Sequence, residues 1–465
     1  MPMHTRPPLV KRFFSLWLAV LAVFVLILVW GVNALTPDDG SKPVATLPGN
    51  PAEPLSLTTP IPPYNADSAE YLLTAFSTRG MRDVTDAEPA FTLLPPGNTV
   101  VAQVIKRGPT PEIMAEGVTV RYNLDEAYAG GANSAVAQGD FKAAVEEAPY
   151  FFSASIPVLP YPAGNRFEPY PTAKAQALNA QGTVLVETGF VLPVSTEIGC
   201  RNCHTGPWKV ADTAGLSAAT ADNILAVHDR RNGTRLAKQA ADKQTVVCRS
   251  CHSGAGEQPN LSAALHGFHA TMKLEGPEAC GLCHPSSEKG RTQFYRGYHA
   301  MWGLDCTRCH GPLTDHAISL LRFEAEKGNK AATARMAQLK PSLVADAKDI
   351  NPREPLVNLP QCRGCHDFKQ KPDASTAMAF NKWTAGESEL YSHMLENTGS
   401  LRCPSCHGSP HALYPATGPD GDDRDNIQPM QYQKAALPLG KDGNCQACHV
   451  EPMPVEAFVH HDRVE

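Results

Sequence analysis

The pattern of apolar and polar residues divides the chain into stretches of different character. Residues 13–34 carry no charge over 22 positions, follow a basic N-terminus and precede Asp38 and Asp39. A membrane-spanning helix needs about 20 apolar residues, whereas the core of a signal peptide has about 7–15. The length therefore predicts a retained anchor, and the basic flank predicts a cytoplasmic N-terminus. Cleavage of a signal peptide after Val32–Ala34 is the alternative, and both interpretations export the rest of the chain.

Two stretches without cysteine follow the predicted N-terminal segment and transmembrane anchor, which together take up residues 1–35. Residues 36–63 contain eight prolines, which argue against a regular helix or a central strand and predict an extended linker. Residues 64–197 contain neither cysteine nor histidine, although they make up more than a quarter of the chain. We expect them to form a separate domain.

The hydrophobic pattern of this second stretch is mostly that of strands. Runs rich in β-branched residues predict strands at 99–106, 118–122, 172–178 and 183–194, the last two joined by a hairpin loop. Residues 67–77 and 139–148 instead have the apolar spacing of short helices. The pattern therefore predicts a small, mainly-β, sandwich-like domain. Its role would be partner docking, shielding of a neighbouring site or structural capping.

The character of the sequence changes again at residue 198. Residues 219–231, 261–274 and 313–327 repeat apolar positions with a helical period, and strand patterns are nearly absent. We therefore predict that residues 198–465 form a domain of short helices and loops with little strand.

All fourteen cysteines lie in this last region, in seven copies of Cys-x-x-Cys-His. The motif contains the residues that attach a c-type haem through two thioethers, with the histidine as proximal iron ligand. A zinc knuckle or a redox dithiol also uses Cys-x-x-Cys, but neither requires the following histidine, and seven repeats favour haem. The predicted attachment residues are Cys200, Cys203, Cys248, Cys251, Cys280, Cys283, Cys306, Cys309, Cys362, Cys365, Cys403, Cys406, Cys445 and Cys448, and the proximal ligands are His204, His252, His284, His310, His366, His407 and His449.

Nine further histidines fall between the first motif and the end of the chain, whereas none falls between the predicted anchor and that motif. This segregation predicts that they supply the sixth iron ligands. Spacing relative to the motifs favours His228, His269, His299, His316, His393 and His411. His266 competes with His269, and either His460 or His461 would supply one more ligand.

Charge adds little to this assignment. The formal net charge of −6 provides no basic surface for nucleic acid, and it suits a basic protein partner. Covalent haem is attached outside the bacterial cytoplasmic membrane, which agrees with the predicted export.

Two segments, 306–316 and 403–411, combine Cys-x-x-Cys-His-Gly with a closely following histidine. The region 198–465 thereby resembles the multihaem c-type cytochromes of respiratory bacteria. The resemblance implies seven covalent haem c groups arranged as an electron-conducting chain. It also implies a single-pass, membrane-anchored protein whose heptahaem domain lies in the periplasm. Such a protein would relay electrons between a membrane-side donor and a periplasmic or outer-membrane acceptor protein in anaerobic-type respiration.

The alternative is a multihaem oxidoreductase of the nitrite, hydroxylamine or tetrathionate type, with one five-coordinate catalytic haem. Many such enzymes use a Cys-x-x-Cys-Lys motif at the catalytic haem, whereas every motif here ends in histidine. An electron carrier is therefore the favoured prediction, and no catalytic residue is assigned.

Overall fold

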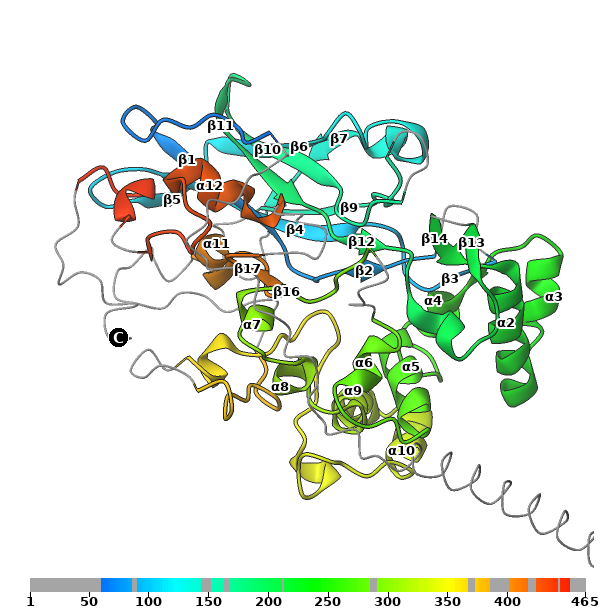
Figure 1. Ribbon diagram of the computed structural model, residues 1–465. Coiled ribbons are helices and arrows are strands. Elements are labelled where there is room, and N and C mark those ends of the chain that lie inside the picture. The colour runs from blue at the N-terminus through cyan, green and yellow to red at the C-terminus, as the bar shows by residue number, and fades with distance from the viewer. Residues whose placement is uncertain are drawn as a thin grey trace, which may run out of the picture. The chain divides into compact units, whose positions relative to one another are not determined.

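The computed structural model describes residues 60–85, 90–114, 116–143, 152–162, 167–210, 213–284, 291–366, 373–384, 401–416, 424–441 and 444–451. The chain divides into two units, Met1–Glu53 and Pro54–Glu465, and the described residues all belong to the second (Figure 1). The predicted anchor at 13–34 lies outside the described residues. Within the described part of the chain, no helix is long and apolar enough to cross a membrane.

Two antiparallel sheets share one hydrophobic core (Figure 1). The first sheet has the order β1 (Tyr71–Ser77), β4 (Asn98–Lys106), β9 (Phe152–Ile156) and β8 (Lys142–Ala143), with β5 (Glu112–Met114) also paired to β4. The second has the order β11 (Val184–Val191), β10 (Thr172–Asn179), β6 (Val118–Leu124) and β7 (Gln138–Asp140). In β6 the residues alternate between the core and solvent, as the period of two in a half-buried strand requires.

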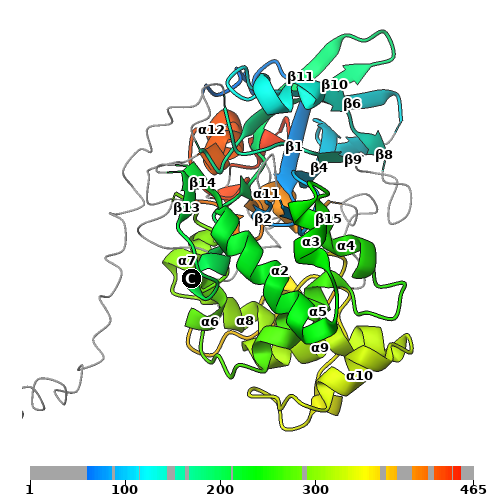
Figure 2. The ribbon, with the colours of Figure 1, turned by 90° about the vertical axis from the view of Figure 1, so that its right-hand side faces the viewer.

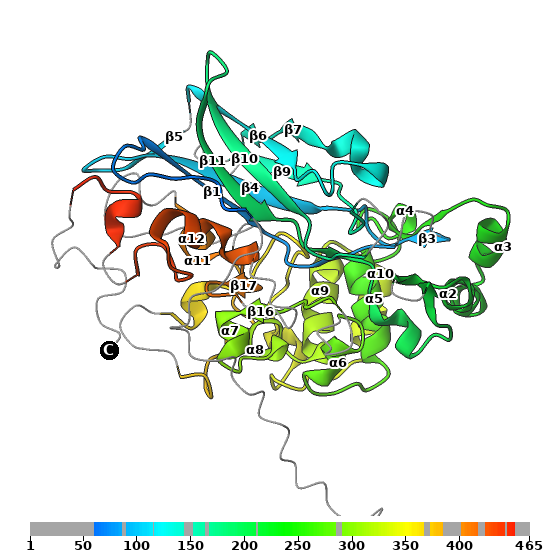
Figure 3. The ribbon, with the colours of Figure 1, turned by 45° about the horizontal axis from the view of Figure 1, so that its top comes forward.

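Strands β1 and β4 are buried on both faces. Leu73 and Val104 point into the core between the sheets, whereas Leu72 and Ile105 pack on the opposite face against Tyr432. Tyr432 belongs to α12 (Ile427–Gln433), which lies against β1 and β11 in two views (Figures 1 and 3). The last part of the chain therefore covers the first sheet.

A second hydrophobic core lies among three helices: α5 (Leu261–Ala270), α9 (Leu313–Glu326) and α10 (Lys330–Met336) (Figure 2). Separately, α2 (Ala218–Asn232) packs against α3 (Leu236–Ala241). The side chain of Ser217 caps the start of α2 by accepting a hydrogen bond from Thr220 N at 3.2 Å. Gly233 ends the helix in the left-handed conformation, with a φ of 67°.

Short strands continue beyond residue 198 and join the two halves of the chain. β15 (Val246–Val247) pairs in parallel with β3 (Phe91–Thr92) and so joins the two halves. Within the first half, β12 (Val194–Ser195) pairs in parallel with β2 (Arg82–Asp83). Within the second half, β13 (Trp208–Val210) pairs with β14 (Thr213–Leu216), and β16 (Arg296–Gly297) pairs with β17 (Ala412–Leu413).

The predicted fold class is therefore wrong. Strands and helices are mixed within one unit, and the second half of the chain is not a distinct helical domain with little strand. The cause is physical: the outer face of β1 and β4 is apolar, and α12 and the segments near it cover that face. A sequence pattern records that a face is apolar but not which distant segment covers it.

Individual elements follow the predictions more closely. The four predicted strands and the three predicted helices are present within a few residues of their expected bounds. Residues 67–77, predicted as a helix, instead contain β1, because a short apolar run fits a strand buried on both faces as well as a helix. Residues 139–148 contain the end of β7 and all of β8, and residues 144–150 lie outside the described ranges.

The buried side chain of Gln103 on β4 joins the first sheet to the segment of the sixth motif. Its Oε1 accepts hydrogen bonds from Arg402 N at 3.0 Å and Ser405 Oγ at 2.6 Å. Gln103→Ala should lower the free energy of unfolding by about 1–3 kcal/mol, because it removes the acceptor from two buried donors. Gln176→Ala, on the partly exposed face of β10, is the matched control and should cost less, because water can replace its side-chain hydrogen bonds with Arg121, Asn123 and Glu187. Equal losses in chemical denaturation would contradict the role given to Gln103.

Candidate functional site

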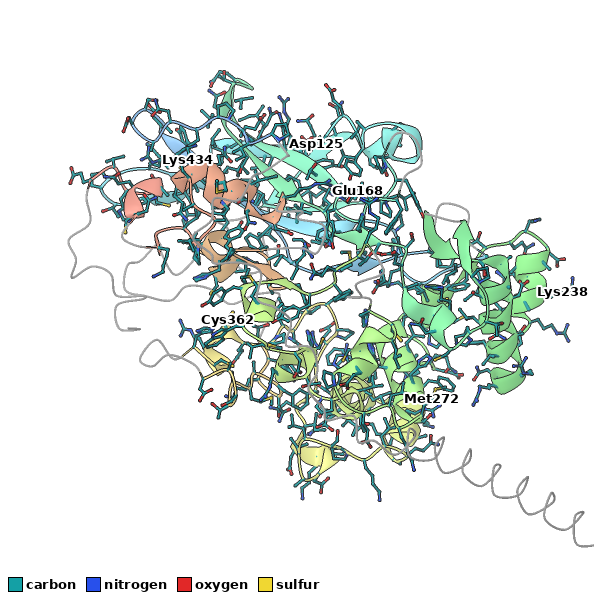
Figure 4. All side chains as sticks on the ribbon, viewed as in Figure 1. Asp125, Glu168, Lys238, Met272, Cys362 and Lys434 are labelled. Carbon is teal, nitrogen blue, oxygen red and sulfur yellow. The ribbon has the colours of Figure 1, made fainter. Side chains whose placement is uncertain are left out.

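Each of the seven motifs lies on a single turn of helix. The turns are η2 (Gly199–Asn202), α4 (Cys248–Cys251), α6 (Glu278–Gly281), α8 (Cys306–His310), η4 (Cys362–Gly364), α11 (Cys403–His407) and η8 (Cys445–Ala447). In the first, for example, His204 N donates to Cys200 O at 2.8 Å. Because side chains three and four positions apart share a face of a helical turn, both thiols and the imidazole point to one side. All fourteen cysteines are free thiols, and Cys362 is one of the exposed ones (Figure 4).

Four of the seven motif histidines are held by one ring nitrogen, Nδ1. For His204 it lies 2.9 Å from Asn223 Oδ1, and for His284 it lies 2.9 Å from Asp83 Oδ2. His252 and His449 contact the backbone oxygens of Pro259 and Pro109, each at 3.0 Å. All four partners are acceptors, so Nδ1 carries the proton and Nε2 keeps its lone pair. This is the arrangement that prepares an imidazole to bind a metal through Nε2.

Histidines outside the motifs are held in the same way. His266 Nδ1 lies 2.8 Å from Ser262 O, and His228 Nδ1 lies 2.9 Å from Thr234 Oγ1. Because the hydroxyl of Thr234 donates to Asp229 Oδ1 at 2.6 Å, it is left to accept from His228. Both rings therefore also leave Nε2 available as a ligand.

Four motif histidines are each opposed by a histidine from outside the motifs. The ring centres are 6.5 Å apart for His228 and His252, 6.2 Å for His266 and His284, 6.0 Å for His299 and His366, and 6.0 Å for His411 and His310. Three pairs have nearly parallel rings, with interplanar angles of 21°, 13° and 7°, whereas the angle between His228 and His252 is 85°. A metal between two imidazoles, with bonds of about 2.0 Å and nitrogens about 1.1 Å from each ring centre, would separate the centres by about 6.2 Å. The spacing would therefore suit two histidines that hold one iron between them.

In these pairs, several predicted sixth ligands oppose a motif histidine that is not the nearest one in the sequence. His228 opposes the motif histidine that follows it in the sequence, whereas His299 and His411 oppose histidines of more distant motifs. His266, rather than His269, opposes His284. Three other candidates, His393, His460 and His461, lie outside the described residues.

His269 lies apart from the paired rings, whereas His316 lies near two of them. In the described part of the chain, the aromatic neighbour of His269 is Phe268, at 5.2 Å. The ring of His316 lies 5.8 Å from His310, a spacing similar to that of the four pairs, and 4.6 Å from His266, which is too short for an iron between those two rings. The Nδ1 atoms of His316 and His411 are buried and have no hydrogen-bond partner among the described residues. Both rings therefore keep unused polar atoms inside the protein.

Burial controls the charge of the paired rings. Loss of hydration lowers the pKa of His266, His299 and His411 to about 4, so these imidazoles are neutral at pH 7. Neutral imidazole is the form that binds metals. Burial also acts to lower the pKa of His284, but the hydrogen bond and the charge of Asp83 outweigh it and raise that pKa.

His310 does not follow the pattern of the other motif histidines. Its Nδ1 lies 3.1 Å from Nη1 of Arg353, and a guanidinium can only donate. Arg353 is buried, which lowers its pKa to about 10, and its Nε donates to Asn358 O at 2.8 Å. A cation therefore faces this ring at the position where the other held rings meet an acceptor.

The strand-rich part of the chain contributes several groups to the motifs. Besides Asp83 and Pro109, Arg107 donates to Gln446 O at 2.7 Å, and the hydroxyl of Tyr64 donates to Ala447 O at 3.3 Å. Sequence reasoning did not find these residues, because backbone oxygens have no sequence pattern and a single aspartate far from the motifs has no distinguishing spacing. The expectation that this part shields or caps a neighbouring site stays a prediction.

Comparison with models of protein families gives no match, and comparison with characterised proteins gives none either. Among the described residues, no group of three or more His, Cys, Asp or Glu side chains is arranged to hold a metal ion. The opposed pairs supply two ligands each, which is the number an iron needs when a porphyrin provides the other four. The donor types, the single-turn motifs and the spacing of the pairs thus fit haem.

Proposed function

We propose that the protein is a heptahaem c-type cytochrome that relays electrons between protein partners. The observation that carries this proposal is the opposition of four motif histidines by four non-motif histidines at 6.0–6.5 Å between ring centres. A haem iron with two imidazole ligands alternates between the ferric and ferrous states without binding substrate. Closed coordination favours a carrier over a catalyst.

The residues of this chain would act by holding their positions. Each pair of thiols would fix one edge of a porphyrin, and each held Nδ1 would fix the plane of an imidazole. An imidazole that is held at Nδ1 by the protein and at Nε2 by the iron would move little when the charge of the iron changes. Small rearrangement is a property that electron carriers need.

Contacts between motifs support a continuous path. In the first and third motifs, Gly199 N donates to Cys283 O at 2.9 Å and Asn202 Nδ2 donates to Leu282 O at 2.8 Å. His316 lies between His266, which opposes the third motif, and His310 of the fourth.

The opposed pairs extend this path to two more motifs. His411, which follows the sixth motif, opposes His310, and His299, which precedes the fourth motif, opposes His366 of the fifth. The first and third to sixth motifs are thereby linked through side chains and backbone. Haems attached along such a path would lie close enough to exchange electrons.

The same proposal places the protein outside the bacterial cytoplasmic membrane. Covalent haem attachment takes place there, and the chain has seven attachment motifs. Its partners would be a membrane-side electron donor and a periplasmic or outer-membrane acceptor. The net charge of −6 favours basic docking surfaces on them.

Denatured, purified protein should carry seven covalent haems in intact-mass measurement. The reason is that the cysteines form seven complete attachment motifs with none left over. A stable count of five or fewer would contradict the proposal. A high-spin haem in the unmodified protein that binds and turns over nitrite or hydroxylamine would instead establish the enzyme alternative.

His266→Ala should convert one low-spin haem to high spin, because it removes the ring opposed to His284. His269→Ala is a matched control on the same helix, since His269 does not oppose a motif histidine among the described residues. Absorption and paramagnetic resonance spectra would report the change. A high-spin signal from His269→Ala with none from His266→Ala would reverse the assignment.

A further inference from the structure

Among the four motif histidines whose Nδ1 donates to a described acceptor, one has a charged partner. His204, His252 and His449 direct Nδ1 to neutral acceptors, whereas His284 directs it to the carboxylate of Asp83. The contact distance is 2.9 Å for Asp83 and also 2.9 Å for the amide of Asn223 at His204. The two hydrogen bonds therefore have the same length and differ in the charge of the acceptor.

The position of Asp83 concentrates its charge on the imidazole. Its side chain is nearly buried, and its second oxygen, Oδ1, has no hydrogen-bond partner among the described residues. The neighbouring Arg82 directs its Nε to Pro95 O at 3.2 Å. Among the described residues, no lysine or arginine forms an ion pair with Asp83. His284 is thus hydrogen-bonded to the buried carboxylate, and the neighbouring Arg82 also interacts with that charge electrostatically.

Asp83 reaches the third motif from the strand-rich part of the chain. Strand β2 pairs in parallel with β12, which places Asp83 opposite Ser195. Ser195 lies just before the first motif, and the first motif contacts the third through Gly199 N and Cys283 O. A carboxylate 201 positions away in the sequence is thereby held against the imidazole by backbone pairing.

We infer that Asp83 gives the third haem a lower potential than the first, second and seventh haems, an inference that rests on the proposed haem binding. A carboxylate that accepts from Nδ1 pulls the proton away from the ring and makes Nε2 a stronger donor to iron. The stronger donor and the buried negative charge both stabilise ferric over ferrous iron. Both effects lower the potential, whereas the neutral acceptors at His204, His252 and His449 strengthen Nε2 less and add no charge.

Two reciprocal substitutions test this inference in the full-length haem protein. Asp83→Asn keeps the size of the side chain and removes its charge, and Asn223→Asp introduces a charge at the equivalent contact of His204. In a spectroelectrochemical titration, Asp83→Asn should raise the potential of one component. The ferrous-to-ferric ratio of that component at a fixed potential should increase about tenfold, which is about 59 mV for one electron. Asn223→Asp should lower a different component.

Paramagnetic resonance adds a readout of ligand strength. The g-values of one low-spin haem should change in Asp83→Asn, because a weaker donor alters the ligand field of its iron. Seven haems with unchanged potentials and g-values in both variants would overturn the inference and leave the proposed function intact. Absence of haem from the unmodified protein would overturn both. If Asp83→Asn fails to fold, an unchanged titration of Asn223→Asp is sufficient to reject the inference.

Discussion

The arrangement of the motif region depends on one interaction: a hydrogen bond from Nδ1 of a motif histidine to an acceptor, which leaves Nε2 free to bind a metal. Four motif histidines meet this condition with groups that lie outside their motifs. Two of these groups, Asp83 and Pro109, come from the strand-rich part of the chain. The orientation of the rings therefore depends on the folding of residues that the motifs do not contain. A motif turn of three to five residues is too short to be stable alone, and such contacts compensate for that weakness.

Burial of apolar surface explains, in addition, why strands and motifs belong to one unit. β1 and β4 bury one face in the core between the sheets, and their other face receives Tyr432 of α12. Gln103 then adds a polar link to the sixth motif from within that second face. A sheet with two apolar faces is stable only when both are covered, and here the second cover is the segment between the last two motifs. The strand-rich part thus holds motifs in place while it completes its own burial.

The sequence predicts the local features well and the long-range ones poorly. The motifs, the main strands and the helices at 219–231, 261–274 and 313–327 could all be recognised, because each depends on residues close in the chain. β1 was mistaken for a helix, since Leu72 and Leu73 are both buried but on opposite faces. His269 was preferred to His266 because spacing along the chain does not show which side of α5 faces the third motif. Asp83 lies 201 positions from its histidine and could not have been found by spacing.

Seven identical motifs would give seven similar sites if nothing else acted on them. The covalent chemistry is the same in each, so differences between the sites must come from residues that do not repeat. At the third motif this residue is a carboxylate, at the first an amide, and at the fourth the guanidinium of Arg353. The third and fourth motifs are neighbours through His266 and His316, so opposite charges act on adjacent rings. If the proposed haems are present, these unequal contacts would give the sites unequal affinities for electrons. One of the three contacting residues, Asp83, comes from the strand-rich part of the chain, so the folding of that part contributes to the difference.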